Sequence, residues 1–162
     1  MSIIVLLLAA AHAGSALAAA VGVGARLPEI GLVDLNGKKI SRKSLAGKVV
    51  IVDFWATWCA PCKEELPVLQ RLYKKYGKRG LVVVGISVDR DKANVRSFAK
   101  KLKLSFPIVH DAKHVVSGRF EPSTMPSSYV VDRKGVIRHV HKGYRSGDDK
   151  KIEREVKALL AK

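Results

Sequence analysis

The two cysteines of the chain, Cys59 and Cys62, lie where a predicted buried strand gives way to a predicted helix. Residues 49–54 form a nearly continuous apolar run, which is typical of a strand that is covered on both faces. Residues 63–76 carry leucine and tyrosine at spacings of three and four, which indicates one apolar helical stripe. Two cysteines three apart at a helix start share a face, so their sulfurs can close a small disulfide ring. The junction therefore favours an α/β fold with a reactive thiol pair.

The remaining pattern also alternates between strands and helices, and 162 residues, 48% of them hydrophobic, suffice for a single domain with a real core. A short hairpin is expected first, with residues 32–35 and 38–40 flanking Asn36-Gly37, a dipeptide that suits a tight two-residue turn. Further strands are expected at 81–88, 128–131 and 136–140, and further helices at 91–104 and 146–160.

Two details of these later elements follow from their flanking residues. Turn-forming residues join the last two strands, so those strands should pair antiparallel. Ser146 or Asp148 should cap the last helix. The predicted fold class is α/β, with a mixed central sheet flanked by helices.

The positions of the two cysteines predict different tasks. Cys59 lies at the helix N-terminus, where free N–H groups and the helix dipole favour an anion, so its thiol should ionise below the free-thiol pKa of ~8.5. Cys62, one turn further and facing the core, is placed to attack a mixed disulfide formed by Cys59. An exposed attacker and a buried resolver suit thiol–disulfide exchange. The alternatives are a fixed structural disulfide or half of a metal site, and the strand-to-helix junction favours exchange.

Residues 52–63, Val-Asp-Phe-Trp-Ala-Thr-Trp-Cys-Ala-Pro-Cys-Lys, resemble the active-site segment of the thioredoxin superfamily. With Pro67 and the run 125–132, Met-Pro-Ser-Ser-Tyr-Val-Val-Asp, followed by Gly135, the pattern resembles its TlpA/ResA-like branch of extracytoplasmic disulfide reductants. The resemblance covers residues 26–162. It implies a thioredoxin-like fold and a protein disulfide reductase that uses the CxxC couple and needs no bound cofactor.

The resemblance also implies where a substrate is held. Pro126 matches the family's cis-proline, which faces the CxxC and helps to present a substrate segment. The expected substrate-binding residues are Trp58, Ala60, Pro61, Met125 and Pro126. Trp55 is expected to pack beneath the loop instead.

Two acids are candidates for moving the proton of the resolving thiol. Asp53 lies in the apolar strand six residues before Cys59, at the position of thioredoxin's buried acid, where TlpA/ResA-like members commonly have Asn. Glu65 lies three residues after Cys62, at the position of that branch's active-site Glu. Burial raises the pKa of a carboxyl, which suits either acid to exchange a proton with Cys62. The alternatives are a satisfied buried polar group for Asp53 and a solvated helix charge for Glu65.

The first 25 residues carry no Asp, Glu, Lys or Arg and open with an apolar run. They indicate a signal peptide, with Ala16-Leu17-Ala18 as a cleavage site, or an uncleaved signal anchor that tethers the chain through residues 3–25. The expected domains are residues 1–25 for this segment and 26–162 for the thioredoxin-like domain. The expected location is periplasmic or otherwise extracytoplasmic, either soluble after cleavage or anchored.

Thirty Lys and Arg against 14 Asp and Glu give a net charge of +16. The positive charge is spread over helix faces, and nucleic-acid-binding motifs are absent from the sequence. No nucleic-acid partner is therefore expected. His110, His114, His139 and His141 lack metal-site spacing, so no dedicated metal site is expected, although His139 and His141 share one face of the last strand.

The expected partners are oxidised proteins outside the cytoplasm, such as apocytochrome c or a copper-site protein, and a membrane thiol donor that recharges the pair. A Cu(I) carrier that uses both cysteines as soft ligands is the alternative. A peroxiredoxin-like peroxidase is less favoured, because its Pro-xxx-Thr/Ser-xx-Cys frame is missing: Val52 and Ile51 stand where its proline would.

Overall fold

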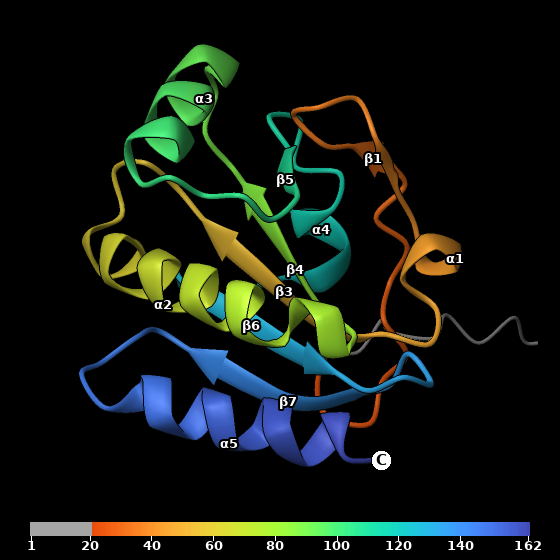
Figure 1. Cartoon of the computed structure of the whole chain (residues 1–162). Helices are drawn as coiled ribbons and strands as arrows, with labels where there is room; N and C mark the ends of the chain where they lie inside the picture. The colour runs from red at the N-terminus through yellow and green to blue at the C-terminus, as the bar shows by residue number, and fades with distance from the viewer. Residues whose placement is uncertain (1–20) are drawn as a thin grey trace, which may run out of the picture.

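The structure is a computed structural model that describes residues 21–162, so the expected cleavage site after Ala18 and most of the expected tether lie outside the described residues. Its centre is a five-stranded sheet in the order β5-β4-β3-β6-β7 (Figure 1). Strands β3, β4 and β5 are parallel, whereas β6 is antiparallel to both β3 and β7. This is the predicted mixed sheet, and with a separate two-stranded N-terminal hairpin it confirms the thioredoxin-like fold class.

Most of the predicted elements are found close to their predicted bounds. The strands are β1 Leu32–Val33, β2 Lys39–Ile40, β3 Val49–Trp55, β4 Leu81–Ser87, β5 Ile108–His110, β6 Ser127–Val131 and β7 Ile137–Lys142. The helices are α1 Arg42–Leu45, α2 Ala60–Tyr76, α3 Lys92–Lys101, α4 Ser117–Phe120 and α5 Asp148–Leu160, and a 3-10 turn, Gly77–Arg79, follows α2. The short elements α1, β5 and α4 were not predicted, because three or four residues carry no measurable periodicity.

All seven residues of β3 are buried, and the alternation of their side chains divides the core in two. Val49, Ile51 and Trp55 pack with the apolar faces of α2, α3 and α5. The intervening side chains pack on the other face with the hairpin, α1 and α4. Figure 1 shows α2 and α5 in front of the sheet and α4 behind it. The predicted inward residues of α5 are buried as expected: Ile152, Val156, Leu159 and Leu160.

The predicted hairpin turn is wrong in detail. The hairpin pairs Val33 with Lys39, and the Asp34 amide donates to the Lys38 carbonyl at 2.9 Å, which leaves a three-residue loop instead of the two-residue Asn36-Gly37 turn. The Asp34 carboxylate accepts from the amides of Asn36 and Lys38, both at 2.9 Å, and this Asp-centred turn competes with the tight turn.

The cap of α5 also differs from the prediction. Its N-cap is Gly147, in a left-handed conformation with φ of 96° and with no side-chain cap, so neither Ser146 nor Asp148 caps it. The Asp148 carboxylate instead accepts from the Arg145 amide at 2.8 Å, one turn upstream. Asp148 and Asp149 then lie in the first helical turn, where negative charge complements the helix dipole.

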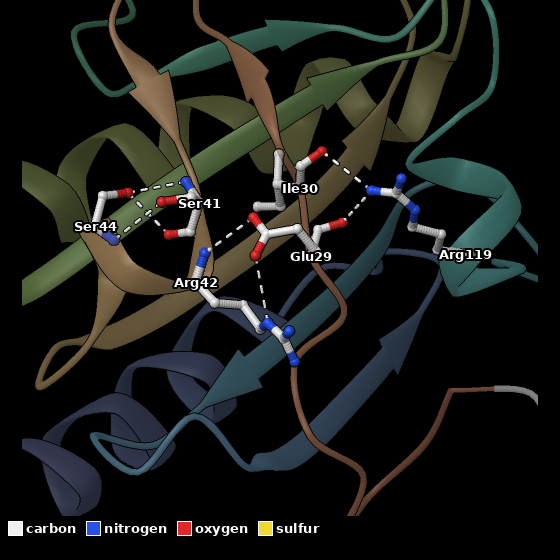
Figure 2. A network of polar contacts seen from close by, with 6 residues as sticks. All are labelled: Glu29, Ile30, Ser41, Arg42, Ser44 and Arg119. Atoms are coloured by element: carbon white, nitrogen blue, oxygen red, sulfur yellow. Dashed lines mark hydrogen bonds and ion pairs between the residues drawn. The ribbon is translucent and has the colours of Figure 1, made fainter.

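The N-terminal segment is fixed to the domain by backbone and side-chain bonds. The Gly24 amide donates to the Ile137 carbonyl at 2.8 Å. Val21 and Ala25, which precede the expected domain start at residue 26, pack on the face of the sheet that α4 covers. Figure 2 shows the Glu29 carboxylate accepting from Arg42, and Arg119 donating to the backbone carbonyls of Glu29 and Ile30. The Ser41–Ser44 capping box starts α1 beside this cluster.

We expect Gly85→Ala to lower the free energy of unfolding by about 1–3 kcal/mol, because overpacking a filled core forces neighbours to shift. A Cβ on Gly85 would lie 2.9 Å from Trp55 Nε1 and 3.0 Å from Phe106 Cε2. Urea denaturation measures the loss. Gly118→Ala is the matched control, because a Cβ there meets nothing within 4 Å. Equal stabilities of the two variants would contradict this description of the core.

Candidate active site

The cysteine pair begins α2, directly beyond the end of β3. Cys59 is the N-cap residue, and its sulfur accepts a hydrogen bond from the Cys62 amide at 3.3 Å. The two sulfurs form a disulfide, with an S–S distance of 2.04 Å and a Cα–Cα distance of 5.3 Å. Pro61 lies in the first turn, where a residue without an N–H costs no helical bond. One backbone donor of the helix start, the Cys62 amide, therefore points at the Cys59 sulfur, as the sequence predicted.

The burial of the pair corrects one expectation. Cys62 is fully buried, as predicted, but Cys59 is only 5% exposed in this disulfide form and is not the exposed attacker that the sequence suggested. Trp58 beside it is 68% exposed. Trp55 is fully buried and stacks on Phe98 with 5.7 Å between ring centroids, which matches its predicted place beneath the loop.

The loop that carries Trp58 and Cys59 is held by an acid that the sequence analysis missed. The buried Asp89 carboxylate accepts from the Thr57 amide at 3.0 Å and from the Thr57 hydroxyl at 2.6 Å. The Ser87 hydroxyl donates to the same carboxylate at 2.8 Å. The position of Asp89 just beyond the apolar run of β4 could have indicated this role, because a buried carboxylate needs hydrogen-bond partners.

The Met125–Pro126 peptide is cis, as the resemblance predicted. Ser127 pairs with Phe54 at the end of β3, so Met125 and Pro126 lie at the sheet edge from which the cysteine loop emerges. Pro126 is buried, Pro61 and Met125 are half-buried, and Ala60 is exposed. A surface cavity of about 520 Å³ adjoins this edge, and its lining includes Thr57, Trp58, Arg90, Asn94, His114 and Met125.

The structure brings the two candidate acids together on the side of the sheet that α2 covers. Asp53 and Glu65 are 0% and 1% exposed, and both contact the Ser128 hydroxyl, at 3.0 Å and 2.7 Å. Burial raises the pKa of Asp53 well above 3.8, and the nearby charge of Glu65 raises it further. Burial also raises the pKa of Glu65, from 4.5 to about 7, although the Ser128 hydrogen bond opposes the rise. The solvated-charge interpretation of Glu65 is therefore wrong.

Two histidines lie near the loop that carries Trp58: the His110 ring bonds the Asp89 carbonyl at 2.8 Å, and His114 lines the cavity beside Trp58. His139 and His141 do share one face of β7, and both approach Glu155 of α5, at 3.5 Å and 2.6 Å. Within residues 21–162 no group of three or more His, Cys, Asp or Glu side chains is arranged to hold a metal ion. In the same part of the chain, no helix is both long and apolar enough to span a bilayer.

A redox pair at the start of α2, a cis-proline beside it and a thioredoxin-like sheet define the class of thioredoxin-like thiol-disulfide oxidoreductases. Residues 23–140 match the AhpC/TSA family, so the chain belongs to that family. Its thiol-disulfide oxidoreductase relatives include ResA of Geobacillus kaustophilus, 33% identical over 86% of this chain and 79% of the relative. The thioredoxin-like protein YneN of Bacillus subtilis is 37% identical over 74% of this chain and 71% of its own.

A solved structure supports the same conclusion. The crystal structure of a Chlorobium tepidum protein, provisionally named thiol:disulfide interchange protein DsbE, superimposes with a TM-score of 0.82 at 27% identity. The match covers 88% of this chain and 99% of that one. With the Cys59–Cys62 couple, these comparisons show that the chain is a thiol-disulfide oxidoreductase.

We expect Glu65→Gln to raise the free energy of unfolding at pH 8 by about 3 kcal/mol and to change it little at pH 4. The pKa of Glu65 is 4.5 in the unfolded reference and about 7 when folded, so the folded chain keeps the proton longer. The stability of the wild type therefore falls as the pH rises from 4.5 to 7, and the amide removes that loss.

Urea denaturation of the oxidised protein at the two pH values measures this difference. Glu64→Gln is the matched control, because Glu64 is the exposed carboxyl one position earlier in α2. It should change stability little at either pH. A gain from Glu65→Gln that is the same at both pH values would contradict the prediction.

Proposed function

We propose that the chain reduces disulfide bonds of exported proteins, with Cys59 as the nucleophile and Cys62 as the resolving thiol. The observation that carries the assignment is that Cys59 is the N-cap of α2 and its sulfur accepts a hydrogen bond from the Cys62 amide, while Cys62 is fully buried. A helix start stabilises the Cys59 thiolate and so lowers the pKa of its thiol in the reduced form. The couple itself supplies the two electrons, so no bound cofactor is required.

The exchange balances in two steps. The Cys59 thiolate attacks one sulfur of the substrate disulfide, forms a mixed disulfide and releases the first substrate thiolate, which takes a proton from solvent. Cys62 then loses its proton to a carboxylate and attacks the Cys59 sulfur. The second substrate thiolate leaves, the substrate is reduced by two electrons, and Cys59–Cys62 is oxidised.

Asp53 and Glu65 are proposed as the acids that exchange the Cys62 proton. Glu65 lies one helical turn beyond Cys62, so their side chains share a face of α2. Asp53 reaches the same region from β3, because its side chain lies on the face that α2 covers. A pKa of about 7 for Glu65 lets a buried carboxyl accept and return a proton near neutral pH.

The substrate segment is proposed to lie along Met125 and Pro126 and to contact Trp58, Ala60 and Pro61. Trp58 offers a large exposed aromatic surface next to the reactive sulfur, and such residues dominate binding energy at protein interfaces. The 520 Å³ cavity beside Trp58 and Met125 gives room for a side chain of the substrate.

The proposed site of action is periplasmic or otherwise extracytoplasmic, with the chain either free after signal cleavage or tethered through residues 3–25. The apolar, uncharged N-terminus and the resemblance to TlpA/ResA-like reductants support this location. Apocytochrome c and copper-site proteins are the proposed substrate classes. A reductant outside the cytoplasm must be recharged, so a membrane thiol donor is the proposed partner.

We expect Cys59→Ser to abolish reduction of a model disulfide protein and Cys62→Ser to accumulate mixed disulfides through Cys59, because only the resolving step is then blocked. Non-reducing gels of purified protein measure the adducts, and capture from cells with Cys62→Ser identifies the partners. The double variant is the control and should form none. Adducts only in Cys59→Ser would reverse the assignment. Tight Cu(I) binding by the reduced wild type, without adducts in Cys62→Ser, would favour a metal carrier.

We expect the Cys59–Cys62 couple to have a reduction potential near thioredoxin's ~ −270 mV, because a reductant needs a dithiol that gives up electrons readily. Equilibration against glutathione buffers, followed by thiol alkylation, measures it. A value near ~ −120 mV would instead identify an oxidant.

A further inference from the structure

One hydroxyl group lies between the two buried acids. Ser128 Oγ is 3.0 Å from Asp53 Oδ1 and 2.7 Å from Glu65 Oε1, and all three residues are at most 1% exposed. Among the described residues, the other carboxyl oxygens, Asp53 Oδ2 and Glu65 Oε2, have no hydrogen-bond partner. Ser128 is thus the one side chain, within residues 21–162, that hydrogen-bonds both acids.

A count of protons limits the states that this arrangement allows. A serine hydroxyl carries one proton and can accept through its lone pairs, whereas an ionised carboxylate only accepts. Ser128 can therefore donate to one acid only. The second short contact needs a proton on the other acid, which then donates to Ser128 Oγ. The two contacts therefore need at least one acidic proton on the pair, and a pair that holds one negative charge and one acidic proton satisfies them.

We propose that Ser128 is a positioning residue that joins Asp53 and Glu65 into one proton-sharing unit during thiol–disulfide exchange. The proton moves in balance: the protonated acid gives its proton to Ser128 Oγ as Ser128 gives its own to the ionised acid. The charge passes from one carboxyl to the other, and no proton is gained or lost. The inference rests on the proposed role of these acids toward Cys62.

The backbone places Ser128 for this task. Ser128 and Asp53 are opposite residues in the antiparallel β6–β3 pair, so their side chains share a face. The Glu65 side chain reaches Ser128 from α2, which packs on this face of the sheet. Ser128 also follows Pro126 by two residues, so the strand that carries the linking hydroxyl begins directly after the proline that is proposed to present a substrate segment.

Several other titratable groups face this unit. On β7, His141 is the residue opposite Ser128, and its ring bonds Glu155 of α5 at 2.6 Å. Burial is the main cause of the raised pKa of Glu65, and the charge of Asp148 on α5 adds to it. Burial likewise raises the pKa of Tyr144, and the charges of Asp149 and Glu65 raise it further. The hydrogen bonds that link the two acids run through Ser128 alone among the described residues.

We expect Ser128→Ala to move the first ionisation of the acid pair about 1–2 pH units higher, because a hydrogen bond to a charged group is lost. Carboxyl-labelled ¹³C NMR titration of the oxidised protein measures this shift without reference to activity. The rising limb of the pH profile for release of the second substrate thiol should move by the same amount in single-turnover reduction of a peptide disulfide. Ser128→Thr, which restores the hydroxyl, should return both curves toward the wild type.

Ser127→Ala is the matched control, because Ser127 is equally buried and its hydroxyl bonds the Thr124 carbonyl at 2.7 Å and neither acid. It should leave both curves in place. A carboxyl titration that does not move in Ser128→Ala overturns the inference, and the proposed function stands if Glu65→Gln still alters the rate profile. If the titration moves but neither Ser128→Ala nor Glu65→Gln alters the rate profile, the proposed role of the acids fails, and the role of Ser128 in exchange fails with it.

Discussion

Burial of β3 on both faces is the constraint on which the rest of the structure depends. Every residue from Val49 to Trp55 is buried, which requires α2, α3 and α5 on one face and the hairpin, α1 and α4 on the other. A strand enclosed in this way reaches the surface only at its ends. The chain leaving Trp55 therefore delivers Trp58 and Cys59 to the sheet edge where the antiparallel β6 begins with its cis-proline.

Asp53 is the one charged residue in that strand, and its position sets the chemistry of the site. A carboxyl without solvent is unfavourable unless it stays neutral or receives hydrogen bonds. The fold supplies both conditions, since burial raises the pKa of the Asp53 carboxyl well above its usual value and the Ser128 hydroxyl contacts it. The neighbouring Glu65 increases the cost, because two carboxylates close together repel each other and so raise the pKa of Asp53 further. Such a cost, placed beside a redox couple, is typical of functional sites.

Where sequence patterns failed, the missing information was a contact made elsewhere. The Asn36-Gly37 dipeptide suits a two-residue turn, but the Asp34 carboxylate binds the loop amides and Leu35 donates to the Ile108 carbonyl, which selects a longer loop. At α5, Asp148 turns back to Arg145 and leaves the cap to Gly147. In both places two local arrangements were available, and a competing side-chain or tertiary bond chose between them.

The sequence by itself determined the alternation of strands and helices and the CxxC at a helix start, because periodicity and motif spacing are local properties. The resemblance of its motifs to a known family added the cis-proline and the two candidate acids. Only the tertiary structure decided that Asp53 and Glu65 meet at Ser128, which is 75 and 63 residues away from them along the chain. The same holds for Asp89, which fixes Thr57 from 32 residues away, and for the low exposure of Cys59. Strand register and the docking of α2 bring these groups together, and neither can be read from the local pattern of residues.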